Sequence, residues 1–134
     1  MQTALVMAQR ATCPRASVGG VIAVRNRIVA TGYNGSPCGT AHCHDVGCLM
    51  HEGHCIRTIH AEANALINAT ISVRGGTIYV THYPCPICAN LIVQSGIAQV
   101  YYLNKYRDTR IAESIFAASM VRIEQFSEKV RLSA

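Results

Sequence analysis

The sequence predicts an α/β fold, an α-β-α sandwich around a mixed five-stranded sheet. Half of the 134 residues are hydrophobic and 14% are charged, which suffices for one core between layers of secondary structure. Two strand-like runs near the N-terminus are separated only by a short polar turn, which is typical of a hairpin. Farther along, strand-like and helical patterns alternate, which implies right-handed crossovers and parallel pairing. We expect a single domain over residues 1–134.

Local signals set the expected boundaries. Proline and glycine interrupt the periodic segments, for example at Cys13-Pro14 and Ser95-Gly96. Pro84 and Pro86 open a helix, because proline is tolerated in a first helical turn. The expected order is a helix over 3–11, strands over 18–24 and 28–33, a helix over 60–69, a strand over 77–81, a helix over 85–94, a strand over 99–103, a helix over 108–118 and a strand over 121–126.

Residues 37–59 show no clear period, and a structureless segment of that length is unusual in a small domain unless something pins it. Four Cys and four His lie between Cys38 and Cys55 and could do so. The whole chain has seven Cys and six His. Because an odd number of Cys does not favour a complete set of disulfides, we expect metal binding.

The net charge of +5 and the isoelectric point of about 9.0 suit an anionic ligand such as a nucleotide phosphate. Nucleic acid would also suit this charge, and so would a plain surface excess of Lys and Arg, but no basic run resembles a nucleic-acid-binding arm. No apolar run approaches the roughly 18 residues that span a bilayer. Residues 1–8 lack the features of a signal peptide. We therefore expect a cytoplasmic protein without a nucleic-acid or membrane partner.

The strongest chemical signal joins His60-Ala61-Glu62 with Pro84-Cys85-Pro86-Ile87-Cys88, at the starts of two expected helices. One helical turn brings Cys85 and Cys88 to the same side. Zinc takes thiolate and imidazole ligands, and a site with three protein ligands keeps a fourth position for water, whose pKa the metal lowers. Glu62 can move a proton from that water to a substrate nitrogen. The sequence therefore predicts a zinc site with His60, Cys85 and Cys88 as ligands and Glu62 as the catalytic proton carrier.

Further motifs surround this site: Cys13-Pro14-Arg15, Val18-Gly19-Gly20-Val21, Gly32-Tyr33-Asn34-Gly35-Ser36-Pro37, His42-Cys43 through Cys48, and His54-Cys55. With the H-x-E and P-C-x-x-C motifs, which are the signature of zinc deaminases, they make nearly the whole chain similar to deoxycytidylate (dCMP) deaminases of the bacterial and phage type. The two catalytic motifs belong to the whole cytidine deaminase superfamily. The Gly-Tyr-Asn-Gly stretch and the cysteine-rich segment are narrower and indicate the nucleotide monophosphate branch.

The resemblance implies a cytidine deaminase-like fold and the hydrolysis of dCMP to dUMP and ammonia, which supplies the precursor of dTMP. Many members are homohexamers that dCTP activates and dTTP inhibits, so we expect a homo-oligomer. The effector site of those members involves the Gly-Tyr-Asn-Gly region, which makes Gly32, Tyr33, Asn34 and Gly35 the candidates here. The first helix is shorter than in the family, a difference expected to weaken oligomer contacts. A turn after a strand is the simpler interpretation of Gly32 to Gly35.

Six residues are candidates for substrate binding. The resemblance suggests that Asn26 contacts the sugar, although Asn is also common in turns. Ala61 lies between two catalytic residues, and Tyr83 and Tyr106 could line the pocket or stack on the base. Arg15 and Arg107 could bind the phosphate, because the guanidinium fork suits phosphate oxygens, or they could be ordinary surface charges.

A second, structural zinc is also implied by the resemblance, since some family members bind one through the N-terminal region and this loop. A metal would offset the ordering entropy of a long loop. The candidate ligands are Cys13, Cys43, Cys48, His54 and Cys55, and the nearby Cys38, His42, His44 and His51 belong to the same pool. The simpler interpretation is a set of buried thiols and solvated imidazoles.

Other functions compatible with these residues stay open. One is a zinc deaminase for another substrate, such as cytidine, dCTP, guanine, a riboflavin precursor or tRNA adenosine. A second is a non-catalytic zinc module or a redox-active C-x-x-C, although neither requires a carboxylate beside His60. A third is a protein of competence or DNA uptake that keeps a deaminase fold.

Overall fold

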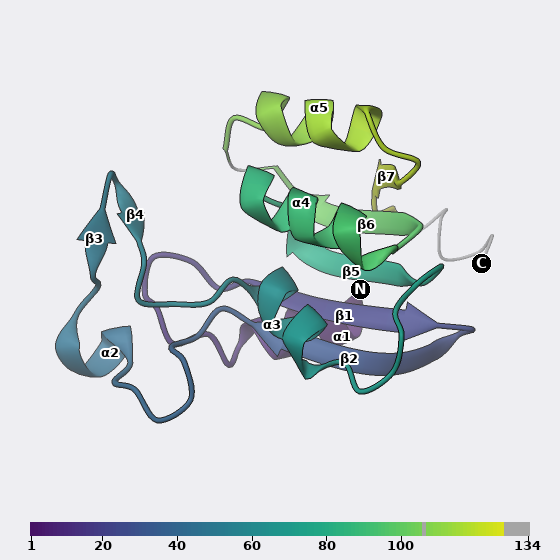
Figure 1. Cartoon of the computed structure of the whole chain (residues 1–134). Coiled ribbons are helices and arrows are strands. Elements are labelled where there is room, and N and C mark those ends of the chain that lie inside the picture. The colour runs from purple at the N-terminus through teal and green to yellow at the C-terminus, as the bar shows by residue number, and fades with distance from the viewer. Residues whose placement is uncertain (106, 128–134) are drawn as a thin grey trace.

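The computed structural model describes residues 1–105 and 107–127, and Figure 1 shows its elements. In chain order these are α1 (Gln2–Ala8), β1 (Gly19–Val24), β2 (Arg27–Tyr33), α2 (Cys43–Val46), β3 (Met50–His51), β4 (His54–Cys55), α3 (Ala61–Asn68), β5 (Thr77–His82), α4 (Pro86–Ser95), β6 (Gln99–Asn104), α5 (Arg110–Ala117) and β7 (Arg122–Gln125). Among the described residues, no helix is long and apolar enough to cross a membrane.

The five-stranded sheet has the order β2-β1-β5-β6-β7, and it is mixed, as the sequence predicts. β1 pairs antiparallel with β2 and with β5, whereas β6 runs parallel to β5 and to β7. The crossovers through α4 and α5 make the second half of the sheet parallel. The C-terminal end of β5 therefore lies beside the start of β1, where Val80 pairs with Gly20.

Helices lie on both faces of the sheet, and glycines in β1 and β2 allow the close approach. A Cβ atom on Gly19 would stand 1.9 Å from the Ala4 carbonyl oxygen of α1, so this residue faces α1. A Cβ on Gly32 would stand 2.3 Å from the Ala61 carbonyl oxygen of α3, on the other face. In Figure 1, α3 and α4 lie in front of the sheet and α1 lies behind it. The α-β-α arrangement is confirmed.

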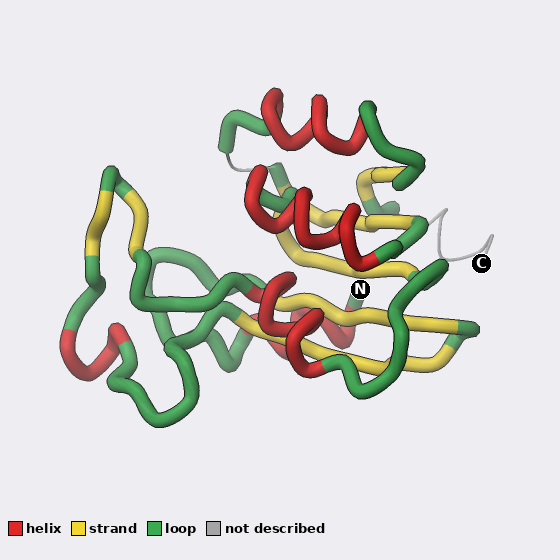
Figure 2. The backbone as a smooth tube through the Cα atoms, viewed as in Figure 1, coloured by secondary structure: helices red, strands yellow, loops and turns green. Residues whose placement is uncertain are grey.

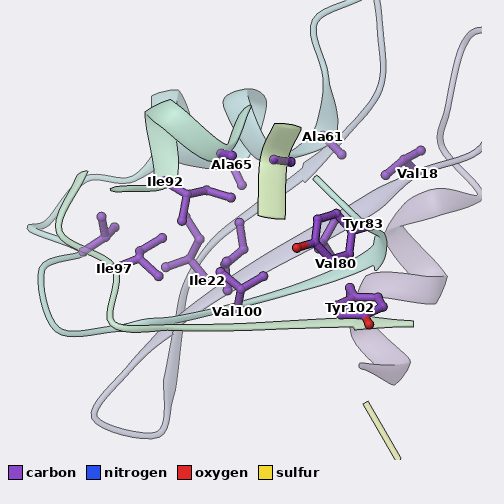
Figure 3. Packing of buried hydrophobic residues seen from close by; sticks show 14 of the residues in the cluster. Val18, Ile22, Ala61, Ala65, Val80, Tyr83, Ile92, Ile97, Val100 and Tyr102 are labelled. Atoms are coloured by element: carbon purple, nitrogen blue, oxygen red, sulfur yellow. The ribbon is translucent and has the colours of Figure 1, made fainter. Parts of the chain in front are cut away.

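The main core lies between the sheet and the layer formed by α3, α4 and α5. Ile22, Ile78, Val80 and Val100 are fully buried on this face of the sheet. Figure 3 shows Ile92 from α4 reaching down toward Ile22 and Val100. Burial of such a side chain contributes roughly 1.5–3 kcal/mol. This packing fixes α3 and α4 to the sheet and thereby fixes the starts of both helices.

All nine expected helices and strands are present, with ends that shift by three residues or fewer. The largest shift is at α1, where Gln9, Arg10 and Ala11 donate to the carbonyls of Val6, Met7 and Ala8 and thus leave the α-helical pattern. α5 begins at Arg110, whose backbone N–H donates to the Asp108 carboxylate at 3.0 Å.

The expectation of an irregular segment over 37–59 was wrong in part. The segment contains the one-turn helix α2 and the hairpin of β3 and β4, which lie apart from the sheet in Figures 1 and 2. Each of these strands has only two residues, and the turn carries positive φ angles at Glu52 and Gly53. Elements this short give no readable period, which is why the sequence did not predict them.

Candidate metal centres and substrate pocket

Three predicted zinc ligands meet at the starts of α3 and α4. His60 is the residue before α3, and Cys85 is the residue before α4. The Sγ atoms of Cys85 and Cys88 lie 3.4 and 3.5 Å from His60 Nδ1. All three atoms fall within 4.8 Å of one another, which is the arrangement that a tetrahedral metal ion with one open position needs.

The electrostatics of this cluster favour a cation at its centre. Hydrogen bonds from Cys88 and His60 lower the pKa of Cys85 to about 4, so this side chain is a thiolate. The same thiolate raises the pKa of His60. The pKa of Cys88 is raised by its hydrogen bond to Cys85 and by burial, because two adjacent thiolates repel each other. A divalent metal would remove this repulsion, so the donor set fits zinc.

Glu62 lies in the first turn of α3 and is 4% exposed. It is not part of the donor cluster. Burial raises the pKa of its carboxyl group, which favours the protonated form. A carboxyl that takes up a proton readily and lies beside the metal ligands is suited to shuttling a proton.

A pocket opens over these residues. Buried Ala61 and Glu62 lie at its floor, and exposed Arg15, His54 and Arg107 form what we call its rim. The other lining residues are Cys13, Ala16, Val18, Asn34, Cys55, Thr58, His60, His82, Tyr83 and Cys85. The predicted catalytic residues and both candidate arginines therefore lie around one cavity. Two cations at the rim suit an anionic ligand.

The other substrate candidates have different positions. Tyr83 lines the pocket and also packs edge-on against Tyr102, with ring centroids 4.7 Å apart. Burial raises the pKa of the Tyr83 hydroxyl to about 12. Tyr106 lies outside the described residues. Asn26 is exposed in the turn between β1 and β2, at the end of β1 that is opposite the pocket. Its positive φ of 62° explains the choice of Asn there, and the structure does not bring it to the pocket.

His82 is a pocket residue that the sequence interpretation missed. It ends β5, directly before Tyr83, and its Nδ1 lies 2.9 Å from the Thr81 hydroxyl. Burial, and then the charge of Arg107, lowers its pKa, so the ring is neutral at physiological pH. Its place at the C-terminal end of a parallel strand, three residues before Cys85, is the signal that could have identified it.

A second cluster, which we call the four-thiol cluster, contains Cys13, Cys43, Cys48 and Cys55. Their Sγ atoms all lie within 4.8 Å of one another, with Cys13 and Cys48 at 3.7 Å and Cys43 and Cys55 at 3.6 Å. Burial and the neighbouring thiols raise the pKa of Cys43 to about 12. The pKa of Cys55 is about 7, because hydrogen bonds from the Arg57 and Leu49 backbone outweigh the effect of burial. Four thiols at this spacing match a closed tetrahedral zinc site.

The remaining candidates of that pool lie outside the four-thiol cluster. His54 Nδ1 is instead 3.5 Å from the Arg107 guanidinium, although His54 directly precedes Cys55. The alternation of side chains along a strand explains this, since adjacent residues of β4 point to opposite sides. Four exposed residues also stay outside the cluster, namely Cys38, His42, His44 and His51.

The stretch from Gly32 to Gly35 makes structural contacts. The Asn34 side chain accepts the Val18 N–H at 2.7 Å and donates to the Ala16 carbonyl at 2.8 Å. Gly35 exchanges two backbone hydrogen bonds with Ile59, and Arg10 lies over the Tyr33 ring. Gly32 packs against α3. Effector binding by these residues stays a prediction.

Comparisons with known proteins agree with this geometry. Residues 1–104 match the family described as the cytidine and deoxycytidylate deaminase zinc-binding region. ComE operon protein 2 of Bacillus subtilis is 47% identical over 123 residues, which are 90% of this chain and 65% of that protein. Deoxycytidylate deaminase of Mycobacterium phage D29 is 40% identical over 111 residues, which are 74% of this chain and 87% of that protein.

The crystal structure of dCMP deaminase from the cyanophage S-TIM5, in complex with dCMP and dUMP, has a TM-score of 0.82 and 33% identity. The match covers 93% of this chain and 92% of that one. The chain spans less than two thirds of the length of the Bacillus subtilis relative. Because the family match covers most of the sequence and includes both catalytic motifs, the protein belongs to the cytidine and deoxycytidylate deaminase zinc-binding family.

Proposed function

We propose that the protein hydrolyses dCMP to dUMP and ammonia with a zinc ion held by His60, Cys85 and Cys88, and so supplies the precursor of dTMP. The convergence of these donors beside buried Glu62, below a cationic rim, carries the proposal. Relatives named deoxycytidylate deaminase and the cyanophage enzyme with dCMP and dUMP support the choice of substrate.

The residues of the pocket have separate roles in this reaction. When bound, zinc activates a water molecule by lowering its pKa. The oxygen of this water would add to C4, while Glu62 accepts its proton and passes protons to ring nitrogen N3 and to the amino nitrogen, so that the bond from C4 to the amino nitrogen breaks and ammonia leaves. Ala61 and Tyr83 shape the floor and one wall around the base. Arg15 and Arg107 line the rim beside His54 and His82, and we assign the phosphate to these two arginines because their guanidinium groups suit phosphate oxygens.

The test compares nucleotides that differ only in phosphorylation or sugar. The purified protein with bound zinc is expected to deaminate dCMP with a higher kcat/KM than deoxycytidine, cytidine or dCTP. A chelator that removes the zinc should abolish turnover. Strong salt-dependent binding of nucleic acid without any deamination would instead support a non-catalytic zinc module.

We also propose that the four-thiol cluster binds a second, structural zinc. The support is the mutual distance of the four Sγ atoms and the choice of thiols at each position. Metal analysis tests this: the wild type should hold two zinc ions per chain. A single ion per chain that is unchanged in Cys43→Ser or Cys48→Ser contradicts the proposal.

Finally, we propose a cytoplasmic homo-oligomer, a hexamer, that dCTP activates and dTTP inhibits through Gly32 to Gly35. Clustered thiols suit a reducing compartment. Exposed Ile56, Ile87 and Leu91 line a groove beside the zinc ligands, and such apolar surfaces favour association. Activity assays with each effector, and the mass of the assembly in solution, test these points.

A further inference from the structure

The four-thiol cluster shares a wall with the substrate pocket. Cys13 and Cys55 belong to the cluster and also line the pocket. Arg15 follows Cys13 by two residues, and His54 directly precedes Cys55. Two of the three rim residues therefore lie within two residues, along the chain, of a cysteine of the cluster. Cys43 and Cys48 complete the cluster from positions that do not line the pocket.

Other described interactions hold the ends of this wall, where Asn34 bonds Ala16 and Val18, and the Ile56 N–H and Arg57 Nε bond the Leu49 and Gly47 carbonyls. β3 and β4 pair only with each other among the described strands. Their two-residue strands are too short to form a stable hairpin alone. Across the wall, the Arg15 guanidinium donates to the Gly53 carbonyl at 3.3 Å, and Arg107 lies 3.5 Å from His54. Both contacts are exposed, so water competes with them.

The catalytic donors are held differently. His60 and Glu62 start α3, and Cys85 and Cys88 start α4, and both helices pack on the sheet through buried Ala65, Ala89 and Ile92. The floor of the pocket therefore depends on the main core. Arg15 and His54 lie instead in segments that the four-thiol cluster joins, and its Cys13 and Cys48 are 35 residues apart in sequence. A metal cross-link across such a separation removes much conformational freedom from the chain.

We propose that the metal-bound four-thiol cluster acts as a clamp that positions Arg15 and His54, and thereby sets the affinity for the phosphate of the substrate. This inference rests on the proposed function for its substrate. When the four-thiol cluster holds no metal, these two side chains must be ordered each time the substrate binds, and this entropic cost raises KM. The metal site on α3 and α4 keeps its geometry, so kcat changes little. Arg15 and His54 are positioned by the cluster, and the thiols act through these two side chains.

The experiment compares Cys48→Ser with Cys38→Ser, a matched control in the same segment whose thiol is exposed and outside the cluster. Zinc per chain, kcat and KM are measured with dCMP and with deoxycytidine, which lacks the phosphate. Cys48→Ser should lose one zinc ion and raise KM for dCMP about tenfold or more, with kcat nearly unchanged. Its kcat/KM for deoxycytidine should match that of the wild type. Cys48→His, which keeps a metal ligand, should restore KM for dCMP.

Three results of the kinetic and zinc measurements would overturn the clamp. One is the loss of a zinc ion without a change in KM for dCMP. Another is an equal loss of kcat/KM for dCMP and deoxycytidine, which indicates a general structural role. Should Cys48→Ser fail to fold, Arg15→Ala leaves the thiols intact and must show the same loss for dCMP alone. A wild-type KM in Arg15→Ala is the third contradicting result.

Hydrogen exchange separates this inference from the proposed function. Amides of residues 15–17 and 53–58 should exchange faster in Cys48→Ser than in Cys38→Ser, while those of α3 and α4 stay protected. Unchanged exchange in the two segments contradicts the clamp, whether or not the protein acts on dCMP. A wild type that holds two zinc ions but does not deaminate dCMP contradicts only the proposed function.

Discussion

Among single residues, Glu62 has the sharpest expected role, because it is buried beside the metal ligands without belonging to them. Glu62→Gln keeps the shape of the side chain but removes its ability to accept a proton. The expected loss in kcat is between about 100- and 10,000-fold. Steady-state kinetics with dCMP measures it.

Zinc analysis of the same variant supplies the control. Glu62→Gln should retain the wild-type zinc content, since none of the donor atoms changes. Loss of zinc together with activity would assign Glu62 a role in holding the metal, and unchanged kcat would remove it from the reaction.

Gly32 offers a second prediction at this scale, with Gly20 as its matched control. These two glycines pair across β1 and β2 on the face covered by α3. A Cβ on Gly32 would stand 2.3 Å from the Ala61 carbonyl oxygen, whereas one on Gly20 finds its nearest atom at 3.5 Å. Gly32→Ala should lower the free energy of unfolding by about 1–3 kcal/mol or more, because backbone atoms cannot yield as a side chain can.

Urea denaturation of both variants measures this difference. Gly20→Ala should stay within about 1 kcal/mol of the wild type, because its new contact is an ordinary van der Waals one. Equal destabilisation of the two variants would contradict the close packing of α3 on β2.

The grouping of the candidate metal donors and Glu62 could be predicted from sequence because its signal is local. His60 with Glu62, and Cys85 with Cys88, each lie within one helical turn, so spacing alone places them together. His82 was missed because a single His at a strand end has no such spacing. Asn26 was assigned to the sugar through a family resemblance, yet its left-handed backbone conformation gives it a turn role at the far end of β1.

At the scale of elements, alternating strands and helices predicted the sheet correctly, because long periodic segments bury a face. The elements of residues 37–59 could not be predicted in this way, because they are too short to show a period. The thiols of this segment also meet Cys13, which lies 35 residues before Cys48. The four-thiol cluster was anticipated only as a pool of candidates, from which the structure selects Cys13, Cys43, Cys48 and Cys55.

The pH dependence of zinc binding tests this cluster. The pKa of Cys43 is raised to about 12 by burial and by the neighbouring thiols, so without metal this thiol stays protonated at neutral pH. Zinc must displace that proton, and protons therefore compete with zinc. The affinity of the four-thiol cluster should fall as the pH falls from mildly alkaline to mildly acidic.

A chromogenic chelator that reports free zinc measures this release, and Cys38→Ser should follow the wild-type profile. Zinc release that does not depend on pH would contradict thiolate ligation at the cluster.

For the whole molecule, the exposed apolar groove predicts association. Leu91 in α4 is 42% exposed and lines the groove beside the zinc ligands. Leu91→Lys should shift the assembly toward smaller species, because a charge buried in an interface is costly. Light scattering after size-exclusion chromatography measures the mass.

Met120 provides the control, since it is 99% exposed between α5 and β7 and does not line the groove. Met120→Lys should keep the wild-type mass. An unchanged assembly in Leu91→Lys would contradict the groove as its interface.

The most direct test of the central claim is the absorbance change of dCMP incubated with the zinc-loaded wild type. The arrangement of His60, Cys85 and Cys88 around buried Glu62, below the cationic rim, predicts conversion to dUMP with release of ammonia. The same solution treated with a strong chelator should leave dCMP unchanged. A wild type with full zinc content that leaves dCMP intact would contradict the proposed function.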